Sequence, residues 1–169
     1  MRTLVFGGAI IALVLALSVL ALSAFGGGSS ESSATDETQI ADKSAIREIE
    51  ENFHESISKK DIAQFMSLWA PHATFSFRGK TSAGIQQIRA RWLKSEGFKP
   101  KTHWVSDHPA WKMNVTVSGD RGTLHFECHF IDVKSEKVAA TTAADMDVAR
   151  IDGRWLITRM VGGTAELSP

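Results

Sequence analysis

The hydrophobic positions of this chain first form one uninterrupted run and then change to helical and finally to strand-like spacing. From Leu4 to Phe25 no residue carries a charge or a side-chain amide. A helix of about 22 residues rises about 33 Å, enough to cross a hydrocarbon core of about 30 Å. The pattern therefore predicts an apolar helix in residues 1–25, either a transmembrane anchor or a signal segment.

Two fates of this segment stay open. A retained anchor fits its length, because the apolar part of a cleavable signal is usually about 7–15 residues long. Cleavage is the alternative, since Ala21-Leu22-Ser23 offers small residues at the right spacing and would leave a secreted or periplasmic protein. Arg2 precedes the run. By the positive-inside tendency we expect a single-pass protein of the cell membrane, with its N-terminus in the cytoplasm and its domain outside.

After this segment the chain predicts a linker and three helices. Residues 26–41 are rich in Gly, Ser and acidic residues and predict a flexible linker. Three stretches then show helical spacing of apolar residues. The first covers residues 42–59, the second opens at Asp61 with Gln64 at capping-box spacing, and the third follows Gly79. Their apolar positions are Ile46, Ile49, Phe53 and Ile57, with Glu48, Glu50, Glu51 and Glu55 between them, then Ile62, Phe65, Leu68 and Trp69, and then Ile85, Ile88 and Trp92.

The rest of the chain alternates with the period of two that is typical of half-buried strands. Asp152-Gly153 tolerates the positive φ angles of a type I′ turn and predicts a tight terminal hairpin. Helices followed by long strands indicate an α+β domain, with about three N-terminal helices packed on a curved antiparallel sheet. We assign residues 42–163 to this domain and residues 164–169 to a C-terminal tail. The predicted strands cover 73–77, 111–117, 124–131, 138–151 and 155–161.

The order of these elements resembles the nuclear transport factor 2-like superfamily, and within it the SnoaL-like group. The resemblance implies a cone-like domain, usually dimeric, with an apolar cavity between helices and concave sheet. Members use that cavity as enzymes, as ligand binders or not at all, so the fold alone implies no reaction. The matching features are Lys60-Asp61, the stretch from Trp69 to Phe75, Gly84-Ile85, the stretch from Thr102 to Val105, the stretch from Val117 to Asp120, and the hairpin from Arg150 to Ile157.

The resemblance also limits the chemistry. The chain contains no Tyr, so the Tyr-containing oxyanion hole of ketosteroid isomerases and the Tyr residues of scytalone dehydratases have no counterpart. His103 is then the best polar candidate, because SnoaL-like sequences often carry a His bordering the cavity before this strand. It would act as a general base in an apolar pocket. A structural His near a loop is the alternative.

Apolar walls and one acidic group complete the expected site. Asp132 continues the apolar face of its strand, where it would reach either the cavity mouth or the solvent. Aromatic residues are expected to line the cavity, although the same side chains would serve equally well to fill it. The candidates for the lining are Phe53, Trp69, Phe75, Trp92, Trp104, Trp111, Phe126 and Asp132.

The predicted strand around residue 128 carries three potential metal ligands, but their spacing argues against a metal site. His125, Glu127 and His129 share one face, but the two His lie about 13 Å apart, too far to bind one zinc ion. Their face is therefore expected to meet solvent or a partner subunit. Cys128 points the other way and is interpreted as a core residue. We expect neither a metal nor another cofactor.

Charge and architecture leave two classes of function. The chain has 19 basic and 19 acidic residues, and this balance argues against a nucleic-acid partner. The first hypothesis is an extracytoplasmic domain, expected to be a homodimer, that binds a small, largely apolar molecule, with or without isomerase- or dehydratase-type acid–base chemistry. The second is a non-catalytic, membrane-tethered interaction or assembly module, similar in outline to superfamily domains in type IV secretion systems.

Overall fold

The computed structural model describes residues 30–107 and 109–164, with side chains from residue 35 to residue 163. The predicted apolar segment 1–25, the start of the predicted linker and residues 165–169 of the predicted tail lie outside the described residues. Within the described part of the chain, no helix combines the length and the hydropathy needed to cross a membrane.

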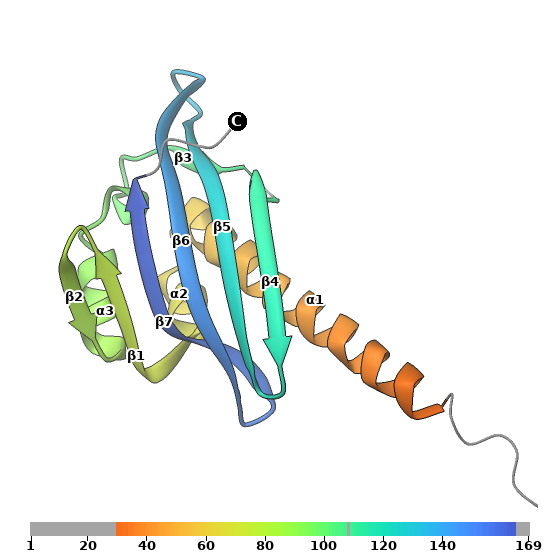
Figure 1. Ribbon diagram of the computed structural model, residues 1–169. Coiled ribbons are helices and arrows are strands. Elements are labelled where there is room, and N and C mark those ends of the chain that lie inside the picture. The colour runs from red at the N-terminus through yellow and green to blue at the C-terminus, as the bar shows by residue number, and fades with distance from the viewer. Residues whose placement is uncertain (1–29, 108, 165–169) are drawn as a thin grey trace, which may run out of the picture.

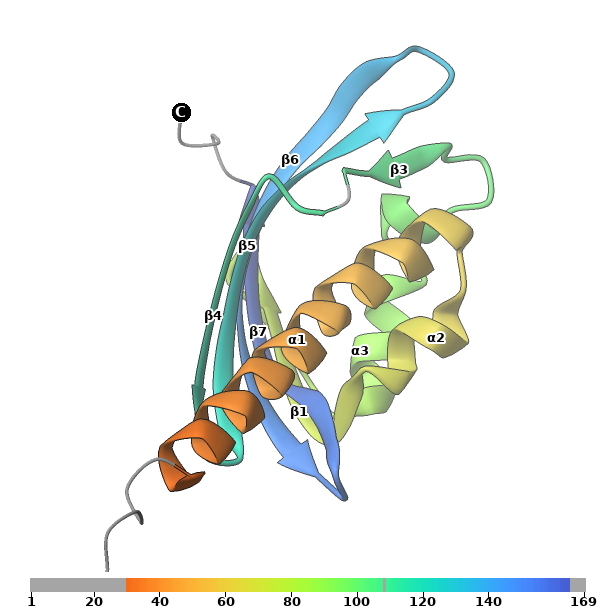
Figure 2. The ribbon, with the colours of Figure 1, turned by 90° about the vertical axis from the view of Figure 1, so that its right-hand side faces the viewer.

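The described residues form an α+β domain in which helices cover one face of a curved sheet, as predicted (Figure 1). Figure 2 shows α1 lying along the concave side of the sheet, with α2 and α3 beside it. The elements are α1 (Ser30–Lys59), α2 (Ile62–Ser67), β1 (Trp69–Phe77), β2 (Lys80–Ala83), α3 (Ile85–Trp92), the 3₁₀ turn η1 (Glu96–Phe98), β3 (Trp104–Ser106), β4 (Lys112–Ser118), β5 (Arg121–Asp132), β6 (Lys137–Ile151) and β7 (Arg154–Thr164).

The sheet is mixed rather than wholly antiparallel. Its strand order is β2-β1-β7-β6-β5-β3, with β4 also paired to β5. β1 and β7 run parallel, with Phe75 opposite Met160, and every other pair is antiparallel. The prediction of an antiparallel sheet was therefore wrong at this one pairing. Alternation of apolar residues reports which face a side chain takes, and it carries no information on the direction of the neighbouring strand.

Three local features differ from the predicted elements. α1 begins at Ser30, so residues 30–41 of the predicted linker are helical, and residues 35–41 are exposed. The short β2 and η1 were not predicted. β1 begins at Trp69, with Pro71 inside the strand. It is tolerated there because the pairing with β7 is irregular between Trp69 and Thr74, where the missing N–H of proline costs no ladder bond.

The core forms where α1 lies on β5. The predicted apolar face of α1 is buried, with Ile46 and Ile57 fully inaccessible. It meets the side chains of β5 that alternate toward the helix, all of which are buried: Leu124, Phe126, Cys128 and Phe130. Gly122 permits the close approach, because a Cβ atom there would lie 2.8 Å from the Ile46 Cδ1 atom and 2.7 Å from the Thr116 carbonyl oxygen.

The terminal hairpin forms as predicted and is tied to α1. Asp152 and Gly153 have φ angles of 50° and 76°, as a type I′ turn requires. Trp155 is buried, and its indole N–H donates to Asp42 Oδ1 at 3.3 Å. Arg150 forms an ion pair with the same carboxylate, and its guanidinium lies over the Trp155 ring at 4.9 Å. The start of the packed part of α1 is thereby fixed to β6 and β7.

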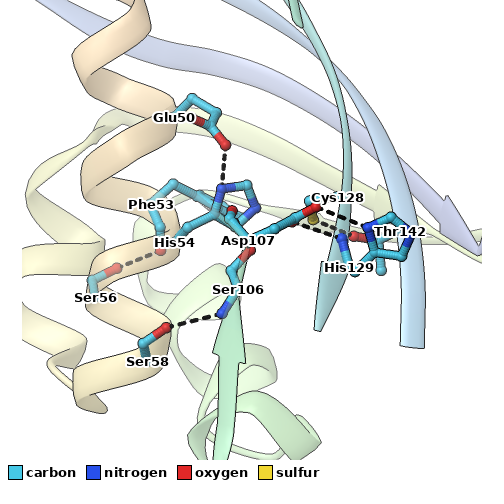
Figure 3. Close-up of polar contacts among 10 residues, drawn as sticks. All are labelled: Glu50, Phe53, His54, Ser56, Ser58, Ser106, Asp107, Cys128, His129 and Thr142. Atoms are coloured by element: carbon cyan, nitrogen blue, oxygen red, sulfur yellow. Dashed lines mark hydrogen bonds and ion pairs between the residues drawn. The ribbon is translucent and has the colours of Figure 1, made fainter. Parts of the chain in front are cut away.

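An ion pair lies inside this core, where the sequence pattern indicated only polar surface. Glu50 was placed among the exposed positions of the first helix, yet its side chain is 0 % exposed and that of His54, one turn later, is 1 % exposed. His54 Nδ1 contacts Glu50 Oε1 as an ion pair (Figure 3). The His54 ring meets the Phe126 ring edge-on at 4.9 Å. Aromatic side chains therefore pack against the His54 ring.

The charge of His54 follows from its neighbours. Burial alone would lower the pKa of the imidazole, but contacts with the side chains of Cys128 and Glu50 outweigh burial and raise the pKa from 6.5 to about 9. His54 is therefore protonated at neutral pH. Among the described residues, neither side chain has a hydrogen bond of good geometry, so the contact between the two is an ion pair. Glu50 is one of the two side chains that favour the charged form of His54, and its removal leaves the imidazolium buried without a carboxylate.

This dependence predicts a loss of stability at alkaline pH. His54 has a higher pKa in the folded protein than in the unfolded chain, so its contribution is complete below about pH 6.5 and is lost as pH rises to about 9. We expect the free energy of unfolding to fall across this window by up to about 1.4 kcal/mol per pH unit. Urea unfolding followed by circular dichroism at several pH values measures this slope.

The double variant Glu50→Leu with His54→Leu is the matched control, since it removes both charges and keeps the volume apolar. We expect it to fold and to lose the slope between pH 6.5 and 9, whereas Glu50→Leu alone costs about 3–5 kcal/mol. Lys60, whose pKa is lowered by burial, acts in the opposite direction at higher pH and is common to all variants. An equal slope in the wild type and the double variant would show that His54 does not titrate in this way.

Candidate functional site

A cavity of about 330 Å³ lies between the helices and the concave face of the sheet, at the end where β3 crosses α1. Ile57 at the end of α1 closes one side, and α3 with η1 closes another. The sheet supplies the remaining wall. The lining consists of Ile57, Phe75, Phe77, Arg78, Arg91, Trp92, Ser95, Glu96, Gly97, Trp104, Phe130, Ala140 and Thr142. A volume of this size is at the small end of the range for ligand pockets.

Five of the lining residues are aromatic, and four of them form two pairs, one stacked and one tilted. The rings of Phe75 and Trp92 stack with centroids 5.1 Å apart and an angle of 28° between their planes. Trp104 and Phe130 form a second pair at 5.9 Å and 32°. The first pair joins β1 to α3 and the second joins β3 to β5, so the rings also hold the cavity walls in place. The interior is therefore mainly flat, apolar surface.

Charged groups gather at the mouth of the cavity. Arg78 and Glu96 are exposed and Arg91 is half-buried. The Arg91 guanidinium donates to the carbonyl oxygens of Lys80 at 2.7 Å and Phe77 at 2.8 Å. It also lies over the Phe75 ring at 4.8 Å. These contacts connect α3 to the β1–β2 turn and fix the position of the guanidinium.

The sheet wall carries one hydroxyl group that connects the cavity to the core. Thr142 on β6 lines the cavity, and its Oγ1 lies 3.0 Å from the Sγ of Cys128 on β5 (Figure 3). Cys128 is fully buried, which confirms its interpretation as a core residue. Its side chain stands between Thr142 and the His54 ring. The buried ion pair is thus close to the cavity wall without lining it.

The structure brings together some of the predicted cavity residues. Phe75, Trp92 and Trp104 line the cavity. Phe53 and Phe126 instead belong to the core and line an adjoining space of about 50 Å³. Trp69 is 3 % exposed and packs edge-on against Phe75 at 6.1 Å, within the core.

The other predicted site residues lie elsewhere. His103 is exposed and does not line the cavity; its carbonyl oxygen accepts from the Val133 N–H at 3.0 Å. Asp132 caps the β5–β6 turn by accepting the N–H groups of Lys134 and Ser135, which lower the pKa of its carboxyl group. Trp111 is 62 % exposed, near the His129 ring and not in the cavity.

The polar face of β5 forms pairs rather than a metal site. His125 Nδ1 lies 2.8 Å from Asp145 Oδ1, and His129 Nδ1 lies 2.8 Å from Asp107 Oδ2. Glu127, between them, is 7 % exposed and pairs with Lys112 and His125. Among the described residues, no group of three or more His, Cys, Asp and Glu is arranged to hold a metal ion.

Sequence reasoning missed the polar residues of the cavity. Arg78 and Arg91 are separated along the chain and each reads as a solvated surface charge. Thr142 lies in a predicted strand that signals no chemistry. The Glu50–His54 pair, which lies beside the cavity and not in its lining, did have a sequence signal. Position 50 falls four residues after Ile46 and position 54 follows Phe53, on the buried side of the helix.

Comparison with known proteins supports the family resemblance. The family model of the SnoaL-like domain matches residues 38–161. Among curated proteins, none matches the chain. Similar solved structures include an NTF2-like protein from Novosphingobium aromaticivorans, with 18 % identity, 85 % of this chain and 94 % of that chain covered and a TM-score of 0.69. Another is an NTF2-like protein from Pseudomonas putida KT2440, with 16 % identity, coverages of 77 % and 98 % and a TM-score of 0.67.

A third similar structure carries a provisional assignment as a ketosteroid isomerase. It comes from Shewanella frigidimarina and shares 16 % identity with this chain, with coverages of 70 % and 94 % and a TM-score of 0.59. At such identities the structural likeness establishes the fold alone. The family model spans most of the chain, and the helices, the curved sheet and the cavity between them agree with it. The chain belongs to the SnoaL-like domain family.

Proposed function

We propose that this domain binds a small, largely apolar molecule in the cavity between α1, α3 and the sheet. The observation that carries the proposal is the cavity itself: about 330 Å³, walled mainly by aromatic and aliphatic side chains, with few polar groups at defined positions. This combination is typical of small-molecule sites. The ketosteroid isomerase assignment of one structural neighbour is in keeping with an apolar ligand.

The lining favours binding over acid–base catalysis inside the cavity. Its described residues include no His, Asp or Tyr. Its one carboxylate, Glu96, is exposed and forms an ion pair with Lys99. A general base needs to lie within hydrogen-bond reach of the proton that it removes. His103 lies outside the cavity, so it would meet that condition only for a substrate held at the outer edge of β3. Isomerase- or dehydratase-type chemistry by His103 is therefore a separate hypothesis that does not involve the cavity.

Filling the cavity is predicted to abolish binding. Ala140 lines the cavity, whereas Ala139 is exposed and does not. We expect the full chain in lipid nanodiscs to bind the neutral probe methyl 2-naphthoate, and Ala140→Phe to weaken binding at least about tenfold because the added ring occupies the ligand volume. Equilibrium dialysis against empty nanodiscs measures the affinity.

Ala139→Phe is the matched control and should bind the probe as the wild type does. A melting temperature near the wild-type value shows that each variant is folded. Equal binding by both variants, or a wild type that binds neither this ester nor its parent acid 2-naphthoate, would refute the proposed ligand site.

We further propose that the domain lies outside the cytoplasm, on the ground of the apolar run from Leu4 to Phe25 with Arg2 before it. In a bacterial host we expect a C-terminal alkaline phosphatase fusion of the full chain to be active and a green fluorescent protein fusion to be dark. The reverse pattern would refute this location. Sedimentation with membranes after alkaline carbonate washing distinguishes a retained anchor from a cleaved signal.

A second candidate function, self-association or partner docking, has its own support. Val105, Ile131 and Val138 are cross-strand neighbours in one row across β3, β5 and β6. Val105 and Val138 are 38 % and 56 % exposed. Together with the exposed Trp111, they present apolar surface from strands that also carry the polar pairs of β5. Exposed apolar surface rimmed by polar residues is typical of interaction sites.

We therefore expect a homodimer that joins through this surface. Analytical ultracentrifugation of the full chain in nanodiscs or detergent should show dimers, and Val138→Lys should increase the dissociation constant about tenfold or more, because it places an unpaired charge in the interface. Leu93→Lys is the matched control, since Leu93 is also exposed but lies after α3. A monomeric wild type, or equal effects of both substitutions, would contradict a dimer of this kind.

A further inference from the structure

We propose that the ligand of this cavity is a planar aromatic carboxylate, with its ring between the aromatic walls and its carboxylate on the guanidinium groups of Arg91 and Arg78. The inference rests on the proposed function and specifies the class of molecule that the same cavity takes. Three observations support it: a fixed guanidinium, an unbalanced positive charge at the mouth and near-parallel aromatic walls.

Arg91 is held in a defined position at the cavity by two backbone hydrogen bonds. Two of its five N–H donors are used by the carbonyl oxygens of Lys80 and Phe77, one on each terminal nitrogen. Its contact with the Phe75 ring fixes the plane of the guanidinium beside the cavity wall. The remaining donors need no reordering of the side chain to meet a ligand, and such preorganisation lowers the entropic cost of binding.

The positive charge at the mouth has no protein counterpart among the described residues. No ion pair joins Arg91 or Arg78 to a carboxylate of the described chain. Glu96 is the acidic group nearest in the lining, and it pairs with Lys99. Arg78 extends over the Phe77 ring, with its guanidinium carbon 5.2 Å from the ring centroid. Two cations at the rim of an apolar cavity therefore favour an anionic group on the ligand.

The shape of the interior favours a flat ring. Phe75 stacks on Trp92, and also lies nearly parallel to Phe77, at 6.3 Å and 20°. The Trp104–Phe130 pair adds a second flat wall. Aromatic surfaces of this kind bind another π-system in an offset stack. A planar guanidinium, in turn, matches a carboxylate through two parallel hydrogen bonds, which a single point charge could not provide.

The test compares two probes that share one ring system and differ in charge and in one methyl group. 2-Naphthoate carries a carboxylate at neutral pH, and methyl 2-naphthoate has the same ring system without the charge. Equilibrium dialysis with the full chain in nanodiscs, with empty nanodiscs as blank, should show about five- to tenfold tighter binding of 2-naphthoate. The preference should shrink as salt is raised, because the rim charges are partly exposed to solvent.

Substitutions then assign the preference to the two arginines. Arg78→Gln and Arg91→Gln should each reduce the binding of 2-naphthoate several-fold and leave that of the methyl ester nearly unchanged. Arg89→Gln is the matched control, because Arg89 is exposed on the same helix but does not line the cavity. Within the described structure, the Arg78 side chain donates no hydrogen bond to a backbone carbonyl, whereas that of Arg91 donates two. The Arg78→Gln variant therefore decides the matter if Arg91→Gln does not fold.

Each outcome separates the two proposals. Equal affinity for both probes overturns the carboxylate class and leaves the apolar ligand site standing. A preference that survives in Arg78→Gln and Arg91→Gln overturns the assignment of the carboxylate to these two arginines. Failure of both probes to bind overturns the ligand site itself. Preferential binding of 2-naphthoate that is also lost in Arg89→Gln would show general charge attraction and would likewise overturn the assignment to the cavity mouth.

Discussion

The packing of α1 along the concave face of the sheet is the constraint on which the rest of the molecule depends. Ile46, Phe53 and Ile57 are buried against the strands, and Gly122 lets the helix approach the sheet closely. Where its packed part begins, α1 is tied to the terminal hairpin through Asp42, and near its end Ile57 closes the cavity. The line of the helix therefore determines where the concave face is filled and where it is left open.

The buried Glu50–His54 pair adds specificity to this contact at a cost in stability. Apolar residues of similar size would fill the same space, and replacement of a buried ion pair by such residues is often neutral or stabilising. Glu50 and His54 lie one turn apart on the same helix, so a shifted α1 would keep the pair together but would move it away from the side chains that pack around His54. The aromatic rings around His54 and the Cys128 side chain beside it lie at the point where the core meets the cavity wall.

The elements that sequence predicted well are those defined by neighbours along the chain. The alternation of Leu124, Phe126 and Cys128 identified the core face of β5, and Asp152-Gly153 identified the hairpin, because both are local properties of the backbone. The parallel pairing of β1 with β7 was missed because its partners are distant in sequence and apolar periodicity has no direction. The start of α1 was missed because a run of polar and small residues has the composition of a linker, whatever its conformation.

Candidate chemistry was harder to predict than the fold, since a side chain acts only where the whole fold places it. His103 directly precedes β3 and lies outside the cavity, whereas Trp104, the first residue of β3, lines it. This difference of a single position decides which of the two side chains can touch a molecule bound in the cavity. Arg78 and Arg91 show the reverse case. Each is an ordinary surface charge in the sequence, and they become a pair only because the β1–β2 turn and the last turn of α3 meet at one end of the cone. The stacked rings that join β1 to α3 maintain this meeting, so the same aromatic residues that stabilise the wall also position the charges of the mouth.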